Sequence, residues 1–235
     1  MKRHLIAALA ATALAPLPAL AFAETRTLDV ATFHGVDAAS GIRAVVSGGQ
    51  PLSVVADAAK TQDLDDLRYE VRDGILHLWY QWTIGDIFDW SGRDITITIG
   101  TEVLDALEAS SGASVEATAL MGEEISLEAS SGGSIKTNAI EGMVYSIEAS
   151  SGARIETSGL CTSANVEVSS GASIGAKELD CAKVSLEASS GASVEITARE
   201  SIAAEVSSGG HATVFGKPGI ESLETSSGGS VDFPS

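Results

Sequence analysis

The chain is poor in positive charge, in aromatic side chains and in cysteine. Its 235 residues include 14 Lys and Arg against 32 Asp and Glu, which gives a formal net charge of −18 at pH 7. An acidic surface repels phosphate backbones and anionic lipid headgroups, so we expect no nucleic-acid partner and no role at a membrane surface. Aromatic residues make up only 5% of the chain, which predicts a narrow core filled by small side chains.

Catalytic signatures are also missing from the sequence. Beyond residue 23 the histidines are His34, His77 and His211, and none of them accompanies a nucleophile motif. The chain has no nucleophile elbow, no phosphate-binding loop and no dinucleotide-binding glycine pattern. We therefore expect a protein that is not an enzyme. The alternative is a β-helix enzyme that acts on polysaccharides, since paired carboxylates can hydrolyse neutral glycans.

Long apolar runs occur only at the beginning of the chain. Residues 1–23 combine two basic residues, a short apolar run and the cleavage pattern Ala21-Phe22-Ala23, which is typical of a signal peptide. No later segment approaches 18 apolar residues, so we expect no integral membrane segment after leader removal. The sequence therefore predicts an exported protein that begins at Glu24 and is periplasmic, outer-surface or secreted.

What the sequence does contain is a repeat. The triplet Ser-Ser-Gly recurs every 18–20 residues, beginning at Ser110, Ser130, Ser150, Ser169, Ser189, Ser207 and Ser226. Around each triplet, apolar and polar residues alternate with the period of a half-buried strand. A unit of about 20 residues cannot bury a core alone, but stacked units cover one another.

We therefore predict an all-β fold, a right-handed parallel β-helix with coils of about 20 residues. A β-sandwich or meander of short hairpins is the alternative. Residues 24–235 are expected to form a single β-solenoid domain. Within it, residues 24–104 form irregular N-terminal coils and a cap, and residues 105–235 form seven regular repeats. The repeat glycines, beginning with Gly112, fall between strands, where a turn needs positive φ.

Three segments resemble the head GIN domain family, whose members are described as autotransporter adhesins. They begin at Phe33 (FHGVDAASGIRAVV), Leu67 (LRYEVRDGILHL) and Asp94 (DITITI), and the Ser-Ser-Gly coils follow. The resemblance covers nearly the whole mature chain. It implies a β-solenoid in an envelope or surface setting, with no catalytic residues. We accordingly expect a non-catalytic exported module, adhesive or scaffolding, whose partner is an envelope polysaccharide or a surface protein.

The sharpest pattern within the repeat is a ladder of acidic residues. One glutamate occupies the same outward position in every coil: Glu108, Glu128, Glu148, Glu167, Glu187, Glu205 and Glu224. Like charges at the spacing of adjacent strands repel one another, and calcium could relieve the repulsion because carboxylates are suitable ligands. The simpler interpretation is a solvated acidic face that prevents sideways aggregation. No cofactor is expected otherwise.

Two further groups of residues could be structural or functional. Cys161 and Cys181 have the same phase in adjacent coils, so stacking predicts a disulfide, with two free thiols as the alternative. Two cysteines without nearby histidines are a poor zinc site. An aromatic cluster could bind a ligand or cap the first coil. It consists of Trp79, Tyr80, Trp82, Phe88 and Trp90.

Overall fold

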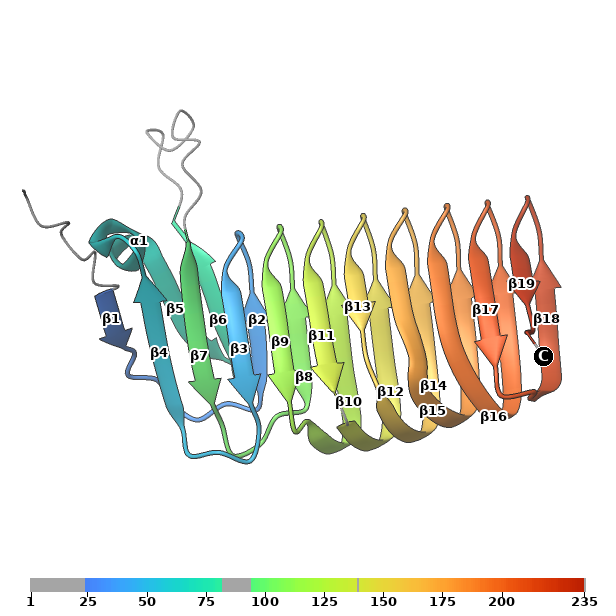
Figure 1. Ribbon diagram of the computed structural model, residues 1–235, viewed down its shortest axis with the longest axis horizontal. Helices are drawn as coiled ribbons and strands as arrows, with labels where there is room; N and C mark the ends of the chain where they lie inside the picture. Colours follow the sequence, from blue (N-terminus) through green and yellow to red (C-terminus); the bar gives the residue numbers. More distant parts are fainter. Residues whose placement is uncertain (1–23, 82–93, 139, 235) are drawn as a thin grey trace, which may run out of the picture.

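The protein folds into a β-solenoid whose coils are stacked along one axis (Figure 1). The computed structural model describes residues 24–81, 94–138 and 140–234. Each coil contributes strands to two opposite faces, and neighbouring coils pair in parallel and in register. The prediction of a parallel β-solenoid is confirmed, and the sandwich or meander alternative is wrong.

One face carries the acidic ladder and is called the glutamate face. Its strands are β6 (Ile75–Tyr80), β2 (Gly35–Ala38), β8 (Ala106–Ala109), β10 (Met121–Ala129), β12 (Ile140–Ala149), β14 (Gly159–Val168), the C-terminal parts of β15 (Ser173–Ala188) and β16 (Ser193–Val206), and β18 (Gly219–Thr225). The opposite face consists of β4 (Ser53–Ala58), β7 (Ile95–Gly100), β3 (Arg43–Ser47), β9 (Ser114–Thr118), β11 (Ser134–Asn138), β13 (Arg154–Glu156), the N-terminal parts of β15 and β16, β17 (His211–Phe215) and β19 (Ser230–Asp232).

Between the two faces lies a continuous apolar core. It forms because alternate residues of each strand point inward, so that Leu107, Leu127 and Ile147 are fully buried in successive coils. The final coil differs from this pattern. Leu223 occupies the same inward position but is 42% exposed, because no described coil covers it.

The Ser-Ser-Gly triplets form the tight turns at one edge of the solenoid. In the first of them, Ser111 (φ 51°) and Gly112 (φ 76°) are both left-handed, and the Ala113 amide donates to the Ser110 carbonyl at 3.0 Å. Two left-handed central residues define a type I′ turn, and each such turn carries the chain from the glutamate face to the opposite face. The predicted role of glycine is therefore confirmed, and the serine before it is left-handed too, which the sequence pattern does not indicate.

The N-terminal section contains a coil that is out of sequence order. Strand β2 pairs with β6 on one side and with β8 on the other, while β3 lies between β7 and β9. The β2–β3 coil is thus inserted between two coils that follow it in the chain. Its turn at Ser40 (φ 60°) and Gly41 (φ 76°) matches the later turns.

Antiparallel strands and one helix cover the N-terminal end of the stack (Figure 1). Strand β1 (Glu24–Thr27) pairs antiparallel with β4, which in turn pairs antiparallel with β7. Strand β5 (Leu67–Arg72) forms a hairpin with β6, and helix α1 (Thr61–Asp66) contributes the buried Leu64. Among the described residues, no helix is long and apolar enough to cross a membrane.

Candidate ligand-binding groove

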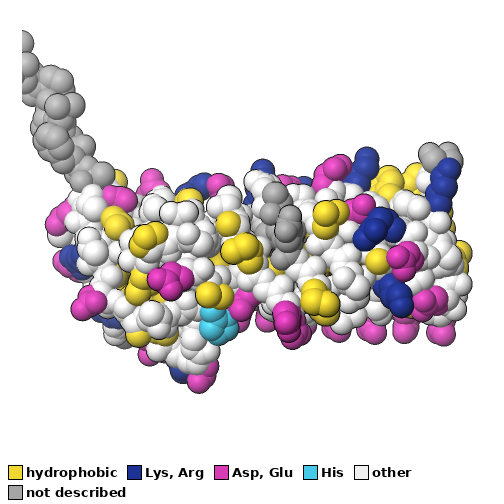
Figure 2. Space-filling model, turned by 90° about the horizontal axis from the view of Figure 1, so that it is seen from below, with side chains coloured by type: hydrophobic (Ala, Val, Ile, Leu, Met, Phe, Trp, Pro, Cys, Tyr) yellow, Lys and Arg dark blue, Asp and Glu magenta, His cyan; other side chains and the backbone are white. Residues whose placement is uncertain are grey.

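The glutamates of the ladder lie in one line along the glutamate face. Register pairs join Glu108 to Glu128, and the same pairing continues coil by coil to Glu224. Each glutamate points outward because its two neighbours in the strand, such as Leu107 and Ala109, point into the core. Figure 2 shows an evenly spaced row of acidic side chains along one edge of the C-terminal half.

A groove of about 280 Å³ runs beside this line over five coils. One wall is built by the glutamates Glu128, Glu148, Glu167, Glu187 and Glu205. The other wall contains the first serines of the turns, Ser150, Ser169, Ser189 and Ser207. The groove thus presents one carboxylate in each of five coils and one turn hydroxyl in four of them. It is the strongest candidate for a binding site in the part of the chain that the structure describes.

The ladder extends further toward the N-terminus than the triplet pattern indicated. Asp37 on β2 is the register partner of Glu108, and His77 on β6 is the register partner of Asp37. The imidazole Nδ1 of His77 lies 2.8 Å from a carboxylate oxygen of Asp37. The sequence offered a signal for Asp37, because it stands two residues before Ala39-Ser40-Gly41 as Glu108 stands two residues before Ser110.

Glu108 is the acid whose environment changes its proton affinity. Burial raises the pKa of Glu108 above its ordinary value, and the charges of Asp37 and Glu128 raise it further. His77 acts in the opposite direction and lowers this pKa. Glu108, at the N-terminal end of the regular ladder, is therefore a position where burial and neighbouring carboxylates together disfavour the charged form.

The described residues contain no group of three or more His, Cys, Asp or Glu side chains placed to hold one metal ion. This follows from the architecture, because parallel strands distribute the carboxylates in single file. Calcium binding between neighbours of the ladder is still the alternative to a solvated acidic face, and a titration tests it.

The three histidines of the described residues are distributed along the solenoid, each beside an acid. His34 Nδ1 lies 2.6 Å from Asp105, and His77 contacts Asp37. His211 lies 2.9 Å from the Ser230 hydroxyl and 3.8 Å from Asp232. This last set has the residue types of a catalytic triad, but the acid is beyond hydrogen-bonding distance and all three residues are exposed.

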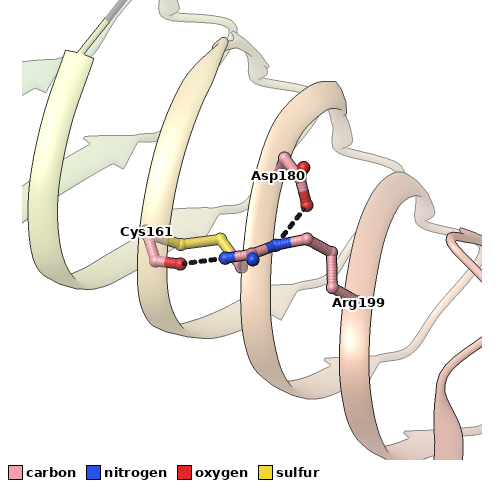
Figure 3. Close-up of a disulfide and its surroundings, with 4 residues drawn as sticks. Cys161, Asp180 and Arg199 are labelled. Atoms are coloured by element: carbon pink, nitrogen blue, oxygen red, sulfur yellow. Dashed lines mark hydrogen bonds and ion pairs between the residues drawn. A yellow bond between two sulfur atoms is a disulfide. The ribbon is translucent and has the colours of Figure 1, made fainter.

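Cys161 and Cys181 form a disulfide between adjacent coils (Figure 3), in agreement with the pairing expected from their phase. Their Cα atoms are 4.5 Å apart, and both side chains are buried. Arg199 in the following coil donates to the Cys161 carbonyl at 3.5 Å and forms an ion pair with Asp180 at 2.8 Å. These two contacts of Arg199 connect three successive coils beside the disulfide.

The aromatic cluster is described only in part. Tyr80 is buried in β6, and Trp79 beside it is half-buried and is the register partner of Arg68. Trp82, Phe88 and Trp90 lie outside the described residues, as does the predicted leader. Whether these aromatics bind a ligand or cap the fold remains a prediction, and the structure assigns the N-terminal cover to β1, β4, β5 and α1.

Comparison with protein families gives one match that spans most of the chain. The family is described as "Putative auto-transporter adhesin, head GIN domain", and the match covers residues 32–218. A search of curated proteins found no relative of this sequence.

Solved structures share the fold at low sequence identity. A structure described as a "putative adhesin" from Bacteroides fragilis NCTC 9343 has a TM-score of 0.82 and 16% identity, covering 91% of this chain and 97% of that one. A "Putative lipid binding protein" from Parabacteroides distasonis ATCC 8503 has a TM-score of 0.69 and 16% identity, with coverage of 91% and 97%. A "putative adhesin" from Parabacteroides merdae ATCC 43184 has a TM-score of 0.66 and 11% identity, with coverage of 91% and 96%. These likenesses show the fold alone, and a fold does not determine a ligand.

Proposed function

The chain belongs to the head GIN domain family of auto-transporter adhesins, and from this premise we propose that it is an exported, non-catalytic adhesive module of the cell envelope or surface. The observation that carries the proposal is the groove on the glutamate face, which repeats one carboxylate per coil over five coils and adds a turn hydroxyl in four of them. A regular array suits a partner that is itself regular. A catalytic site, in contrast, needs a few different groups that converge on one point.

We further propose that the partner is a neutral envelope polysaccharide. Carboxylates accept hydrogen bonds from sugar hydroxyls, and serine hydroxyls can donate or accept. Coils in a parallel stack are about 4.8 Å apart, which is close to the length of one pyranose unit in an extended glycan. The net charge of −18 disfavours acidic polysaccharides. A surface protein remains the alternative partner.

Co-sedimentation tests this proposal directly. The purified protein is incubated with a panel of insoluble neutral and acidic polysaccharides and with cell envelopes, and bound protein and released reducing ends are measured together. We expect retention on a neutral polysaccharide without release of reducing ends. Release would support the alternative of a polysaccharide-active enzyme, and no retention on any glycan would contradict the proposed partner.

Charge-matched variants locate the binding surface. Replacing three groove acids with alanine (Glu148, Glu167 and Glu187) should weaken retention about tenfold, which corresponds to roughly 0.5 kcal/mol lost at each carboxylate. The control replaces three acids of the opposite face with alanine (Glu116, Glu195 and Asp232). It removes the same charge from exposed positions and should retain binding. Equal loss in both variants would assign the effect to net charge and not to the groove.

A further inference from the structure

The sulfur atoms of the chain are divided between its interior and its surface. Beyond residue 23 they belong to Cys161, Cys181, Met121 and Met143. The two cysteines are buried and joined as a disulfide. The two methionines are instead 58% and 57% exposed, and the buried hydrophobic residues of the described chain include no methionine. The thioethers that an oxidant in solution can reach are therefore confined to the surface.

Both methionines lie at the bend opposite the Ser-Ser-Gly turns, which we call the lower bend. Here each coil passes from the opposite face to the glutamate face. Met121 begins β10, Met143 lies on β12, and register pairing places Gly122 beside Gly142. The two thioethers thus flank one glycine pair in neighbouring coils. Figure 2 views this surface from below and shows hydrophobic side chains over the N-terminal and middle coils.

The adjacent glycine explains why Met143 points outward. A Cβ atom on Gly142 would come within 2.9 Å of the ring of Tyr145, which is fully buried. Gly142 therefore faces the core, and Met143 next to it in the strand faces solvent because neighbouring side chains alternate. Gly122 is the register partner of Gly142, so Met121 has the same kind of neighbour.

Negative charge surrounds this part of the lower bend. Residues 101–105 and 119–124 contain acids and no Lys or Arg. Glu123 and Glu124 follow Met121 closely on β10, and both are exposed. An acidic surface lowers the local concentration of anions but not that of neutral molecules. A neutral peroxide therefore reaches the thioethers, whereas an anionic oxidant is repelled.

We propose that Met121 and Met143 form an oxidation site whose substrate is a neutral peroxide. The sulfur lone pair attacks one peroxide oxygen, so that an S–O bond forms and the O–O bond breaks. Sulfur is oxidised to the sulfoxide and gives two electrons to the peroxide. With hydrogen peroxide, the other oxygen leaves as hydroxide, takes up the proton released from the attacked oxygen and becomes water.

Oxidation changes the surface and leaves the fold intact. A sulfoxide is polar, so the lower bend loses two exposed apolar side chains and keeps Val103 and Leu160. The stacking of the coils is preserved because neither Met121 nor Met143 belongs to the core. In the exported setting proposed above, the protein meets an oxidising environment. The apolar character of the lower bend would then depend on the oxidant present.

Treatment of the purified full chain with hydrogen peroxide tests the proposal, and peptide mass spectrometry locates each added oxygen. We expect Met121 and Met143 to react within about threefold of the rate of N-acetylmethionine amide, because both are more than half exposed. The oxidised protein should elute earlier in hydrophobic-interaction chromatography. Its melting temperature should stay within about 2 °C of that of the reduced protein, since neither thioether lies in the core. This test does not depend on the adhesive function.

Two variants separate the effect of exposure from the effect of the sulfur. Met121→Leu with Met143→Leu keeps the surface apolar and should lose most of the change in elution. Leu127→Met places a thioether on the same strand β10 at a fully buried position, where it should react at least about tenfold more slowly than Met121. The proposal is wrong if both native methionines react as slowly as this buried one. It is also wrong if the double leucine variant keeps the full change in elution.

An anionic oxidant tests the choice of substrate. Relative to N-acetylmethionine amide, peroxymonosulfate should oxidise both methionines several-fold more slowly than hydrogen peroxide does. Sodium perchlorate at about 500 mM should reduce this difference by screening. Glu123→Gln with Glu124→Gln should accelerate the reaction with peroxymonosulfate and leave that with hydrogen peroxide unchanged. Equal relative rates for the two oxidants at low salt would contradict a site selective for neutral peroxides.

Discussion

Asp37 and Glu108 are register partners on the adjacent parallel strands β2 and β8, although 71 residues separate them in the chain. Their carboxylates are therefore one strand spacing apart on the glutamate face. Asp37 is also held by His77 at 2.8 Å, while Glu108 continues into the ladder through Glu128. This contact joins the inserted N-terminal coil to the regular repeats, and it does so with two like charges.

The pKa of Glu108 gives a prediction about stability and pH. This pKa is raised from 4.5 in the folded protein, mainly by burial. The folded protein therefore binds this proton more tightly than the unfolded protein does. The ionised carboxylate lowers the free energy of unfolding as the pH rises above 4.5, the ordinary pKa of this group. We expect Glu108→Gln to increase the free energy of unfolding at pH 7 by about 0.5 kcal/mol. Below pH 4.5 the gain should vanish.

Urea denaturation of both proteins at pH 4 and pH 7 measures this difference. Glu224→Gln serves as the control, because Glu224 lies in the final coil and has only one ladder neighbour among the described residues. Its effect at pH 7 should be smaller. If Glu108→Gln is no more stable than the unmodified protein at pH 7, the charged Glu108 carboxylate does not destabilise the fold, which would contradict this prediction.

Repulsion along the ladder predicts a dependence on salt. Neighbouring carboxylates on the exposed face are screened by ions, so NaCl should raise the melting temperature of the protein. Glu167→Gln removes two like-charge contacts and should raise the melting temperature at low salt more than at high salt. Thermal unfolding monitored by circular dichroism in 10 mM and 500 mM NaCl measures both effects.

Calcium distinguishes screening from specific binding. Since no three carboxylates converge in the described part of the chain, we expect CaCl₂ to raise the melting temperature no more than NaCl of equal ionic strength. A cation that binds only the folded state adds stability beyond screening. A larger rise with calcium, reduced in Glu167→Gln, would establish the ladder as a cation site.

The disulfide between Cys161 and Cys181 should contribute substantially to stability. It closes a loop with a sequence separation of 20 residues, for which the loss of chain entropy in the unfolded state corresponds to about 3 kcal/mol. We expect the double variant Cys161→Ser, Cys181→Ser to lose an amount of this order in guanidinium denaturation. The protein reduced with dithiothreitol is the control and should behave alike. If reduction leaves the denaturation midpoint unchanged, the bond does not form in solution.

Local periodicity made the regular coils predictable. The alternation of apolar and polar residues identified inward positions such as Leu127, and the constant spacing of the triplets predicted the stacking of Cys161 on Cys181. These features repeat within about 20 residues, so a single coil contains the information that the fold uses. The groove follows from the same repetition, because its carboxylates and hydroxyls occupy fixed positions in each unit.

The insertion of the β2–β3 coil could not be predicted in this way. Alternation shows which side of a strand faces the core, but it does not show which strand lies beside it. Ala39 replaces the first serine of the triplet, so the turn at Ser40-Gly41 lacks the signature that marks the other coils. Asp37 and its contact with His77 were missed for the same reason. The order of coils depends on pairing between segments far apart in sequence, which no local pattern encodes.

The turn geometry leads to a final prediction that compares two glycines of one coil. Gly171 has φ +71° and open space around the position of a Cβ atom, so alanine there meets only backbone strain. Gly175 on β15 has no such φ, and an added Cβ would make ordinary contacts at 3.8 and 3.9 Å. We expect Gly171→Ala to lower the free energy of unfolding by about 1 kcal/mol. Gly175→Ala should instead be neutral or raise it by about 0.5 kcal/mol. Denaturant unfolding of the two variants separates the outcomes, and equal effects would show that the left-handed turn is not required for the stacking of the coils.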